Sequence, residues 1–113
     1  MDKDVKQKWV AALRSGKYRQ CQGELKDAIG ANCCLGVLLE THGWKETTSY
    51  KDKSIFSNYV SPKGVINMEE NELDEYTADQ FGLNRQQQVH LMKLNDDKGW
   101  SFKLISKWIE DHL

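Results

Sequence analysis

The 113-residue sequence lacks the features of several large classes of protein. It contains no run of about 18 apolar residues, so we expect no transmembrane helix and no membrane partner. Its first four residues, Met1 to Asp4, have no apolar core, which argues against a secretory signal peptide. Its three cysteines, an odd number, fit a reducing compartment better than a disulfide framework. These absences predict a cytoplasmic protein.

A strong excess of either charge is also missing, because 16 basic residues nearly balance 17 acidic ones to give a net charge of −1. Strong nucleic-acid binders usually carry a basic excess, and mimics of DNA need a large negative charge over the whole domain. The composition therefore argues against a nucleic-acid partner. The charges are nevertheless uneven, since six basic residues face only two acidic ones in residues 1–20, and residues 69–79 contain acidic residues without a base. This asymmetry predicts either two solvated faces or a docking surface for a charged partner.

The motifs of common enzymes are absent. The chain has no glycine-rich phosphate loop ahead of a helix, no His-Glu-x-x-His, no Gly-x-Ser-x-Gly and no carboxylate pair in an apolar context. It has no Cys-x-x-Cys, and adjacent cysteines rarely chelate one zinc ion. The stretch from Asn95 to Gly99 lacks the further acidic ligands of a calcium loop. We therefore expect neither an enzyme nor a bound metal or other cofactor.

The chain does contain enough apolar sequence for a single core. Hydrophobic residues make up 39% of it, including four Trp, four Tyr and three Phe. A chain of this length forms one domain, so residues 1–113 are predicted to be a single small domain. The expected class is α+β, with about four to five helices packed on a small antiparallel sheet.

Apolar residues at helical spacing, together with capping residues and glycines, predict where the helices lie. The expected helices run from Asp2 or Asp4 to Gly16, from Cys33 to His42 behind a cap at Asn32, from Glu75 to Phe81, from Arg85 to Leu94 behind a cap at Asn84, and from Ser101 to Leu113. The second helix has so little polar surface that it should be central. Its apolar residues are expected to share one core with those of the first and last helices, namely Trp9, Leu13, Leu35, Leu38, Phe102, Ile105 and Ile109.

Strands are expected in two parts of the chain. Lys17 to Leu25 alternates in character, with Tyr18 and Gln20 on one face. The polar but β-prone insertion at 45–67 should add roughly two or three short strands to the same sheet. Turns are expected at 27–30 and at 61–64, where the only proline lies.

Two blocks of sequence resemble a known family. The first runs from Trp9 to Gln20 as W-x-x-A-L-R-S-G-x-Y-x-Q and resumes from Cys33 to Leu38 as C-C-L-G-V-L. The second, from Leu94 to Phe102, reads L-N-D-x-x-G-x-S-F. Together they resemble a family of small bacteriophage and prophage proteins of unassigned biochemistry. The resemblance implies an accessory role in the host cytoplasm, such as counter-defence or host modification, exerted by stoichiometric binding.

The first block suggests a pocket for a small anionic, nucleotide-like ligand. Arg14, Tyr18 and Gln20 are expected near the start of the second helix, beside Cys33. Arginine offers a planar fork for phosphate or carboxylate, and a helix start adds backbone N–H donors. These four residues are the predicted ligand-binding set. The alternative is structural: Arg14 caps carbonyls of its own helix, Tyr18 packs beneath the sheet, and Cys33 is a small buried hydrophobe.

Three further interpretations stay open. Cys33 would be a nucleophile only if a histidine lay near it, and none of the three histidines has a recognisable context. The acidic stretch at 69–79 would suit an inhibitor of a host protein. The last two helices resemble part of a helix-turn-helix, although the final helix offers Phe102 where polar base-reading residues are needed. A homo-oligomer is compatible with each of these functions.

Overall fold

Five α-helices and one β-ribbon make up the part of the chain that the computed structural model describes, which is residues 1–51 and 54–113, with only the backbone at 48–51 and 54–57. The helices are α1 (Lys3–Arg14), α2 (Cys34–Thr41), α3 (Glu75–Gln80), α4 (Arg85–Met92) and α5 (Phe102–His112), and a π-helical turn, η1 (Lys93–Asp97), extends α4. The antiparallel ribbon consists of β1 (Lys45–Lys51) and β2 (Ser54–Val60). The class is therefore α+β, as predicted. None of the described helices has the length and apolar character needed to cross a membrane.

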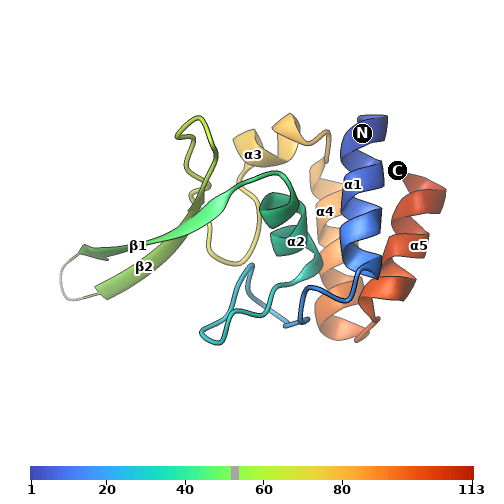
Figure 1. Cartoon of the computed structure of the whole chain (residues 1–113), viewed down its shortest axis with the longest axis horizontal. Helices are drawn as coiled ribbons and strands as arrows, with labels where there is room; N and C mark the ends of the chain where they lie inside the picture. Colours follow the sequence, from blue (N-terminus) through green and yellow to red (C-terminus); the bar gives the residue numbers. More distant parts are fainter. Residues whose placement is uncertain (52–53) are drawn as a thin grey trace.

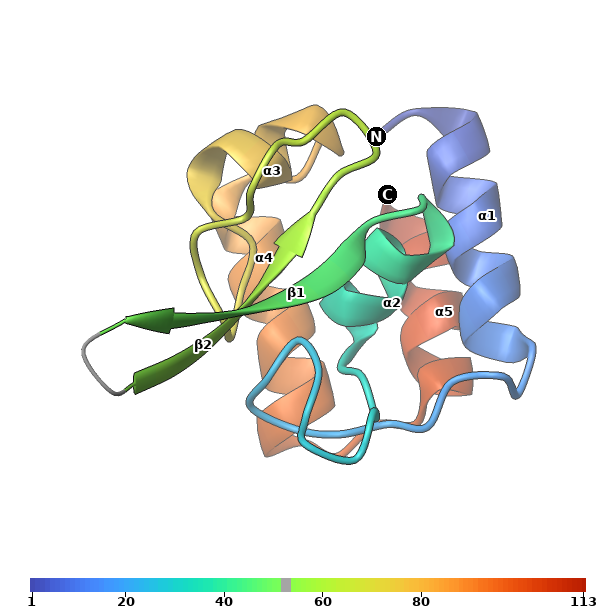
Figure 2. The same cartoon turned by 60° about the vertical axis from the view of Figure 1, so that its left-hand side comes forward.

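The helices gather at one side of the molecule, and the ribbon projects from the other (Figure 1). Helices α1 and α5 lie antiparallel and in contact, and α2 contacts both α1 and α4 (Figures 1 and 2). The ribbon contributes to an elongated outline of 44 × 27 × 25 Å. The helical side therefore holds the core, while two paired strands extend away from it.

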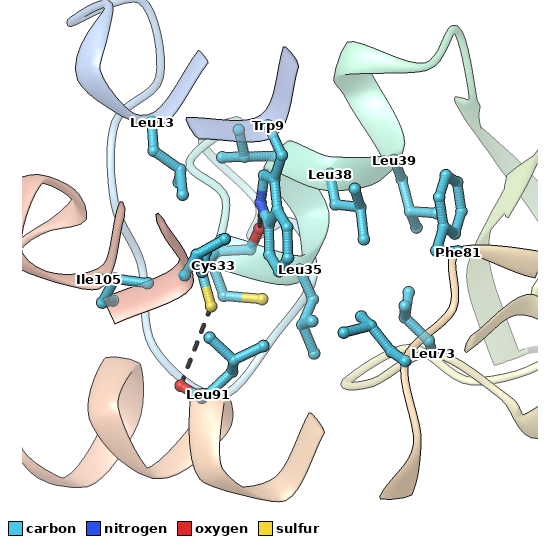
Figure 3. Packing of buried hydrophobic residues seen from close by; sticks show 14 of the residues in the cluster. Trp9, Leu13, Cys33, Leu35, Leu38, Leu39, Leu73, Phe81, Leu91 and Ile105 are labelled. Atoms are coloured by element: carbon cyan, nitrogen blue, oxygen red, sulfur yellow. Dashed lines mark hydrogen bonds between the residues drawn. The ribbon is translucent and has the colours of Figure 1, made fainter. Parts of the chain in front are cut away.

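Helix α2 forms the centre of the core, as its composition predicts. All six residues from Cys34 to Leu39 are buried, and the Trp9 indole Nε1 donates a hydrogen bond of 2.9 Å to the Cys34 carbonyl. The seven predicted core residues are all buried and belong to one apolar cluster. Figure 3 shows the Trp9 ring beside Leu35 in this core, with Leu13 and Leu38 on either side of it. The prediction of the core is confirmed.

Local capping explains most helix ends. The Asp2 carboxylate accepts from Val5 N at 3.1 Å, and α1 ends before Gly16, whose φ of +77° suits glycine. Asn84 and Gln87 form a reciprocal capping box at α4. The Ser101 hydroxyl accepts from Leu104 N at 3.3 Å at the start of α5. These three predicted starts are confirmed.

The prediction of a strand from Lys17 to Leu25 is wrong. This segment is an irregular loop that winds around Asn32, and only isolated bridges at Gln20 and Lys26 pair with that residue. Gly23, with a φ of +78°, breaks the extended conformation that an alternating pattern would need. The loop's backbone groups bond to separate partners instead of to one neighbouring strand, so no ladder forms.

Two predicted boundaries also need correction. Asn32 does not cap α2, because its Nδ2 donates to the Leu25 carbonyl and to the Tyr59 hydroxyl, both at 2.9 Å. The chain after α4 does not leave the helix before Asn95 but continues through η1 to Asp97. Asn95, which lies in η1, takes the place expected of Asn32 at the start of α2, because its Oδ1 accepts from Cys34 N at 3.2 Å.

The predicted β-prone insertion at 45–67 contains the ribbon and the turn at 61–64, where Gly64 N donates to the Ser61 carbonyl at 2.9 Å. Its residues 52–53 lie outside the described residues. The turn at 27–30 is also present, with Gly30 N donating to the Asp27 carbonyl at 3.1 Å. Both turn predictions are confirmed.

Candidate functional site

Arg14, the first residue of the predicted anion pocket, bonds to α5. Its Nε donates to the Ser106 hydroxyl at 2.9 Å, and its Nη1 donates to Glu110 Oε2 at 3.0 Å. These bonds join helices that are far apart in the sequence, so the Arg14 side chain connects α1 to α5. Its side chain is nevertheless 39% exposed, which leaves it accessible to a ligand.

Gln20 belongs to a buried network at the start of α2. Its Nε2 donates to Asn95 Oδ1 at 2.9 Å and to the Trp100 carbonyl at 2.8 Å. The fully buried Asn95 also donates from Nδ2 to the Cys21 carbonyl at 2.8 Å. Asn95 thus lies where an anion was expected to meet the first N–H groups of α2. The sequence offered no local signal for this role, because its partners are distant along the chain.

The cysteines are buried thiols. Burial raises the pKa of Cys33 to about 12, and the backbone N–H groups of Gly36 and Leu35 lower it by less than burial raises it. Burial, followed by the nearby Asp27 carboxylate, raises the pKa of Cys21 to about 11. Burial also raises the pKa of Cys34, whose Sγ lies 3.9 Å from the Leu91 carbonyl (Figure 3). At neutral pH these thiols are protonated, so Cys33 lacks the thiolate that a nucleophile requires.

Tyr18 packs against the apolar core. It is half-buried and lines a shallow hollow with Lys26 and Glu40. The structure therefore links Gln20 to the start of α2, next to Cys33. It places Arg14 against α5 and Tyr18 at the hollow that Lys26 and Glu40 also line. None of four hollows in the described part of the chain is lined by all four residues.

Residues 66–79 form a second surface, on which no residue of the predicted pocket lies. The fully buried Asn67 organises it: Nδ2 donates to the carbonyls of Glu69 and Glu72 at 2.8 and 3.1 Å, and Oδ1 accepts from Asp74 N at 2.8 Å. One side chain therefore folds this segment back on itself. A single buried asparagine in an acidic stretch gives no pattern from which the sequence would predict such a role.

Asp74 attaches this segment to α3. Its Oδ1 accepts from Thr77 N at 2.8 Å as the N-cap of the helix, and its Oδ2 accepts from Met68 N at 2.7 Å. Partial burial opposes ionisation, but these backbone hydrogen bonds outweigh it and hold the pKa of Asp74 below its usual value. Met68 is thereby kept beside the first turn of α3.

The same segment exposes large apolar side chains. Met68 is 70% exposed, Tyr76 64% and Ile66 50%, and these are three of the five large apolar residues that stand out at the surface of the described chain. Acidic residues lie among them, namely Glu69, Glu70, Glu72, Asp74, Glu75 and Asp79. We call the exposed residues of 66–79 the acidic face.

A hollow adjoins the acidic face between α3 and α4. It has a volume of about 530 Å³, and the apolar residues Leu73, Ala78 and Leu83 line it together with the carboxylates of Glu75 and Asp79. On the α4 side it includes Arg85, which pairs with Glu72. The hollow therefore combines apolar residues with two acidic residues of α3 and with Arg85 of α4.

The fold and this surface define a small α+β domain with an acidic face that exposes large apolar side chains. The whole chain, residues 1–113, matches the model of the family described as domain of unknown function DUF8296, and the protein belongs to that family. No curated protein and no solved structure matches the chain. The family description gives no activity, so function has to be argued from the surface itself.

Proposed function

We propose that this protein acts by stoichiometric binding, and that its acidic face docks a basic, apolar-faced segment of a partner protein. The observation that carries the proposal is the concentration of exposed Met68, Tyr76 and Ile66 within an acidic stretch that contains no base. Contiguous exposed apolar patches rimmed by polar residues mark interaction sites, whereas single exposed apolar residues are ordinary. Ile66, Met68 and Tyr76 belong to one short segment, which the bonds of Asn67 fold back on itself. Methionine and tyrosine are also enriched at protein interfaces.

The hollow beside α3 indicates the chemistry of the partner. A lysine or arginine has an apolar stem and a charged end. The stem would lie on Leu73 and Leu83, and the cation would reach Glu75 or Asp79 at the edge. Because these carboxylates are close to solvent, their contribution falls with salt and acts mainly on the rate of association.

The resemblance to small phage proteins makes a host protein the expected partner and inhibition or redirection of that protein the expected effect. The protonated, buried thiols support binding rather than nucleophilic catalysis. A DNA-reading helix gains no support from α5, because Phe102 in its first turn is buried in the core. The four-residue anion pocket stays a prediction and plays no part in this proposal.

A first experiment uses a synthetic amphipathic helix made only of leucine and lysine as the probe. Titration calorimetry should show saturable binding that weakens with salt, and a matched leucine–glutamate helix should not bind. Asp79→Lys should reduce affinity for the basic helix by roughly tenfold or more, since it turns an attraction into a repulsion. Asp97→Lys makes the same change of charge at an exposed site outside the acidic face and should leave affinity nearly unchanged.

A second experiment asks whether a cellular partner uses the same face. The tagged protein and both lysine variants would be used for affinity capture from a bacterial lysate, followed by mass spectrometry. A protein recovered by wild type and Asp97→Lys but lost with Asp79→Lys and Met68→Asp would support the proposal. Equal effects of Asp79→Lys and Asp97→Lys in both experiments would contradict it, because net charge alone would then explain the binding.

A further inference from the structure

A groove between α1 and α5 has the opposite character to the acidic face. Its volume is about 530 Å³, and its lining combines apolar surface from Val10 and Ala11 with the charged residues Lys3, Lys6, Arg14 and Glu110 and the polar Gln7. Small-molecule sites commonly measure about 300–1,000 Å³. The groove therefore has the size of a site for a small molecule.

The spacing of α1 explains how the cations come together. Lys3, Gln7, Val10 and Arg14 follow one another at intervals of three or four residues, which places them along a single face of the helix. Lys6 is half-buried, as expected of a lysine whose stem lies on apolar surface while its ammonium group stays near water. The face thus presents cations around an apolar strip.

Arg14 is held in place before any ligand arrives. Ser106 accepts from its Nε and Glu110 accepts from its Nη1, at 2.9 and 3.0 Å. These two bonds fix the plane of the guanidinium and leave further N–H donors on it. Less side-chain freedom is then lost when an anion binds, which favours affinity.

We infer that this groove binds a small organic anion that has an apolar body and a carboxylate, sulfonate or phosphate group. The body would lie on Val10 and Ala11, and the anionic group would face Lys3, Lys6 and Arg14. Three cations against the single carboxylate of Glu110 give the lining a positive balance. The site uses Arg14 but not Tyr18, Gln20 or Cys33, and it is independent of the acidic face.

The probe for this site is 8-anilinonaphthalene-1-sulfonate, an aromatic sulfonate whose fluorescence rises in apolar surroundings. The neutral control is N-phenyl-1-naphthylamine, which has the same aromatic body without the sulfonate. Wild-type protein should bind the sulfonate with one-to-one stoichiometry and the neutral compound at least roughly tenfold more weakly, since only the former gains charge-assisted contacts. Equal affinity for the two compounds would overturn the inference.

Matched variants locate the binding. Lys6→Glu should lower affinity for the sulfonate by roughly tenfold or more, whereas Lys8→Glu, on the same helix but outside the groove, should change it little. Ala11→Phe should fill the groove and abolish binding without a change of charge, and Asp79→Lys should have no such effect. If Lys6→Glu lowers the melting temperature, Lys6→Gln is used in its place. It should lower affinity for the sulfonate by less than Lys6→Glu but by more than Lys8→Glu does. Equal losses in the Lys6 and Lys8 variants, or full binding by Ala11→Phe, would refute the site.

Discussion

Replacing Gly36 with alanine is expected to destabilise this protein, although the same change inside a helix usually stabilises it. A Cβ at position 36 would lie 2.0 Å from the Leu25 carbonyl oxygen and 2.8 Å from Asn32 Nδ2, whereas ordinary van der Waals contact begins near 3.4 Å. The nearer atom belongs to the backbone, so it cannot turn away. Either α2 or the loop that carries Leu25 has to move.

The magnitude follows from three effects. Overpacking costs about 1–3 kcal/mol, and loss of the buried bond from Asn32 Nδ2 to the Leu25 carbonyl leaves polar groups unpaired at a cost of about 1–3 kcal/mol. The higher helix propensity of alanine offsets about 1 kcal/mol. The net loss in unfolding free energy is therefore about 1–5 kcal/mol, a large part of the stability of an ordinary domain.

Urea unfolding followed by tryptophan fluorescence would measure this loss, because Trp9 is buried in the same core. Gly16→Ala is the matched control: its φ of +77° makes alanine strained, but a Cβ there meets nothing within 4 Å. It should cost only about 1–2 kcal/mol. If Gly36→Ala proved as stable as wild type, or more stable, the close approach of the loop to α2 would be refuted.

Four other outcomes are expected. Asn95→Ala should lower unfolding free energy by about 2–4 kcal/mol, because it removes the cap of α2 and leaves the Cys21 carbonyl and one of the two Gln20 Nε2–H groups without a partner; hydrogen exchange at Cys34 should accelerate, and unchanged exchange would contradict the network. The pKa of Asp74 is lower in the folded protein than its ordinary value of 3.8, so the ionised carboxylate stabilises the fold at pH values above 3.8, and this contribution is lost as pH falls through the pKa of the folded state. Asp74→Asn should therefore be less stable than wild type at neutral pH, and the difference between their urea midpoints should shrink in acid. Arg14→Ala should cost about 1–2 kcal/mol in thermal melts, because it removes a partly exposed ion pair with Glu110 and one hydrogen bond to the Ser106 hydroxyl; a much larger loss would make Arg14 chiefly a structural residue. Native protein should react slowly with iodoacetamide near neutral pH and yield all three thiols only after unfolding, because burial raises the pKa of the Cys33 thiol to about 12 and that of Cys21 to about 11; fast labelling of the native protein would argue against this burial.

Local signals in the sequence predicted the helices well. Asp2, Asn84 and Ser101 each cap a helix through the residue three positions later, so the chemistry that starts each helix lies within one short stretch. Apolar spacing likewise identified the core, since burial of one helix face repeats with the helical period. These features depend on neighbours in the chain and were readable from it.

The errors arose where partners are distant. Lys17 to Leu25 alternates like a strand, but its bonds go to residues such as Asn32, Glu70 and Asn95, which no short pattern reveals. Arg14 was expected to face the start of α2, yet its partners lie in α5, 92 and 96 positions later. The grouping of the candidate binding residues therefore could not be predicted, although the acidic stretch that forms one face was visible in the sequence.

The long-range cap of α2 has a consequence for how the chain acquires its structure during synthesis. The N–H of Cys34 has its hydrogen-bond acceptor in Asn95, 61 positions later, and Ile105 and Ile109 complete the core around Trp9. A growing chain in which these positions have not yet been synthesised contains the apolar α2 segment without the cap from Asn95 and without the α5 residues that pack on it. Folding should therefore be delayed until nearly the whole chain has left the ribosome and should then proceed in one cooperative step. A nascent chain stalled before Asn95 should be sensitive to protease throughout, whereas one extended beyond Leu113 by a linker should become resistant.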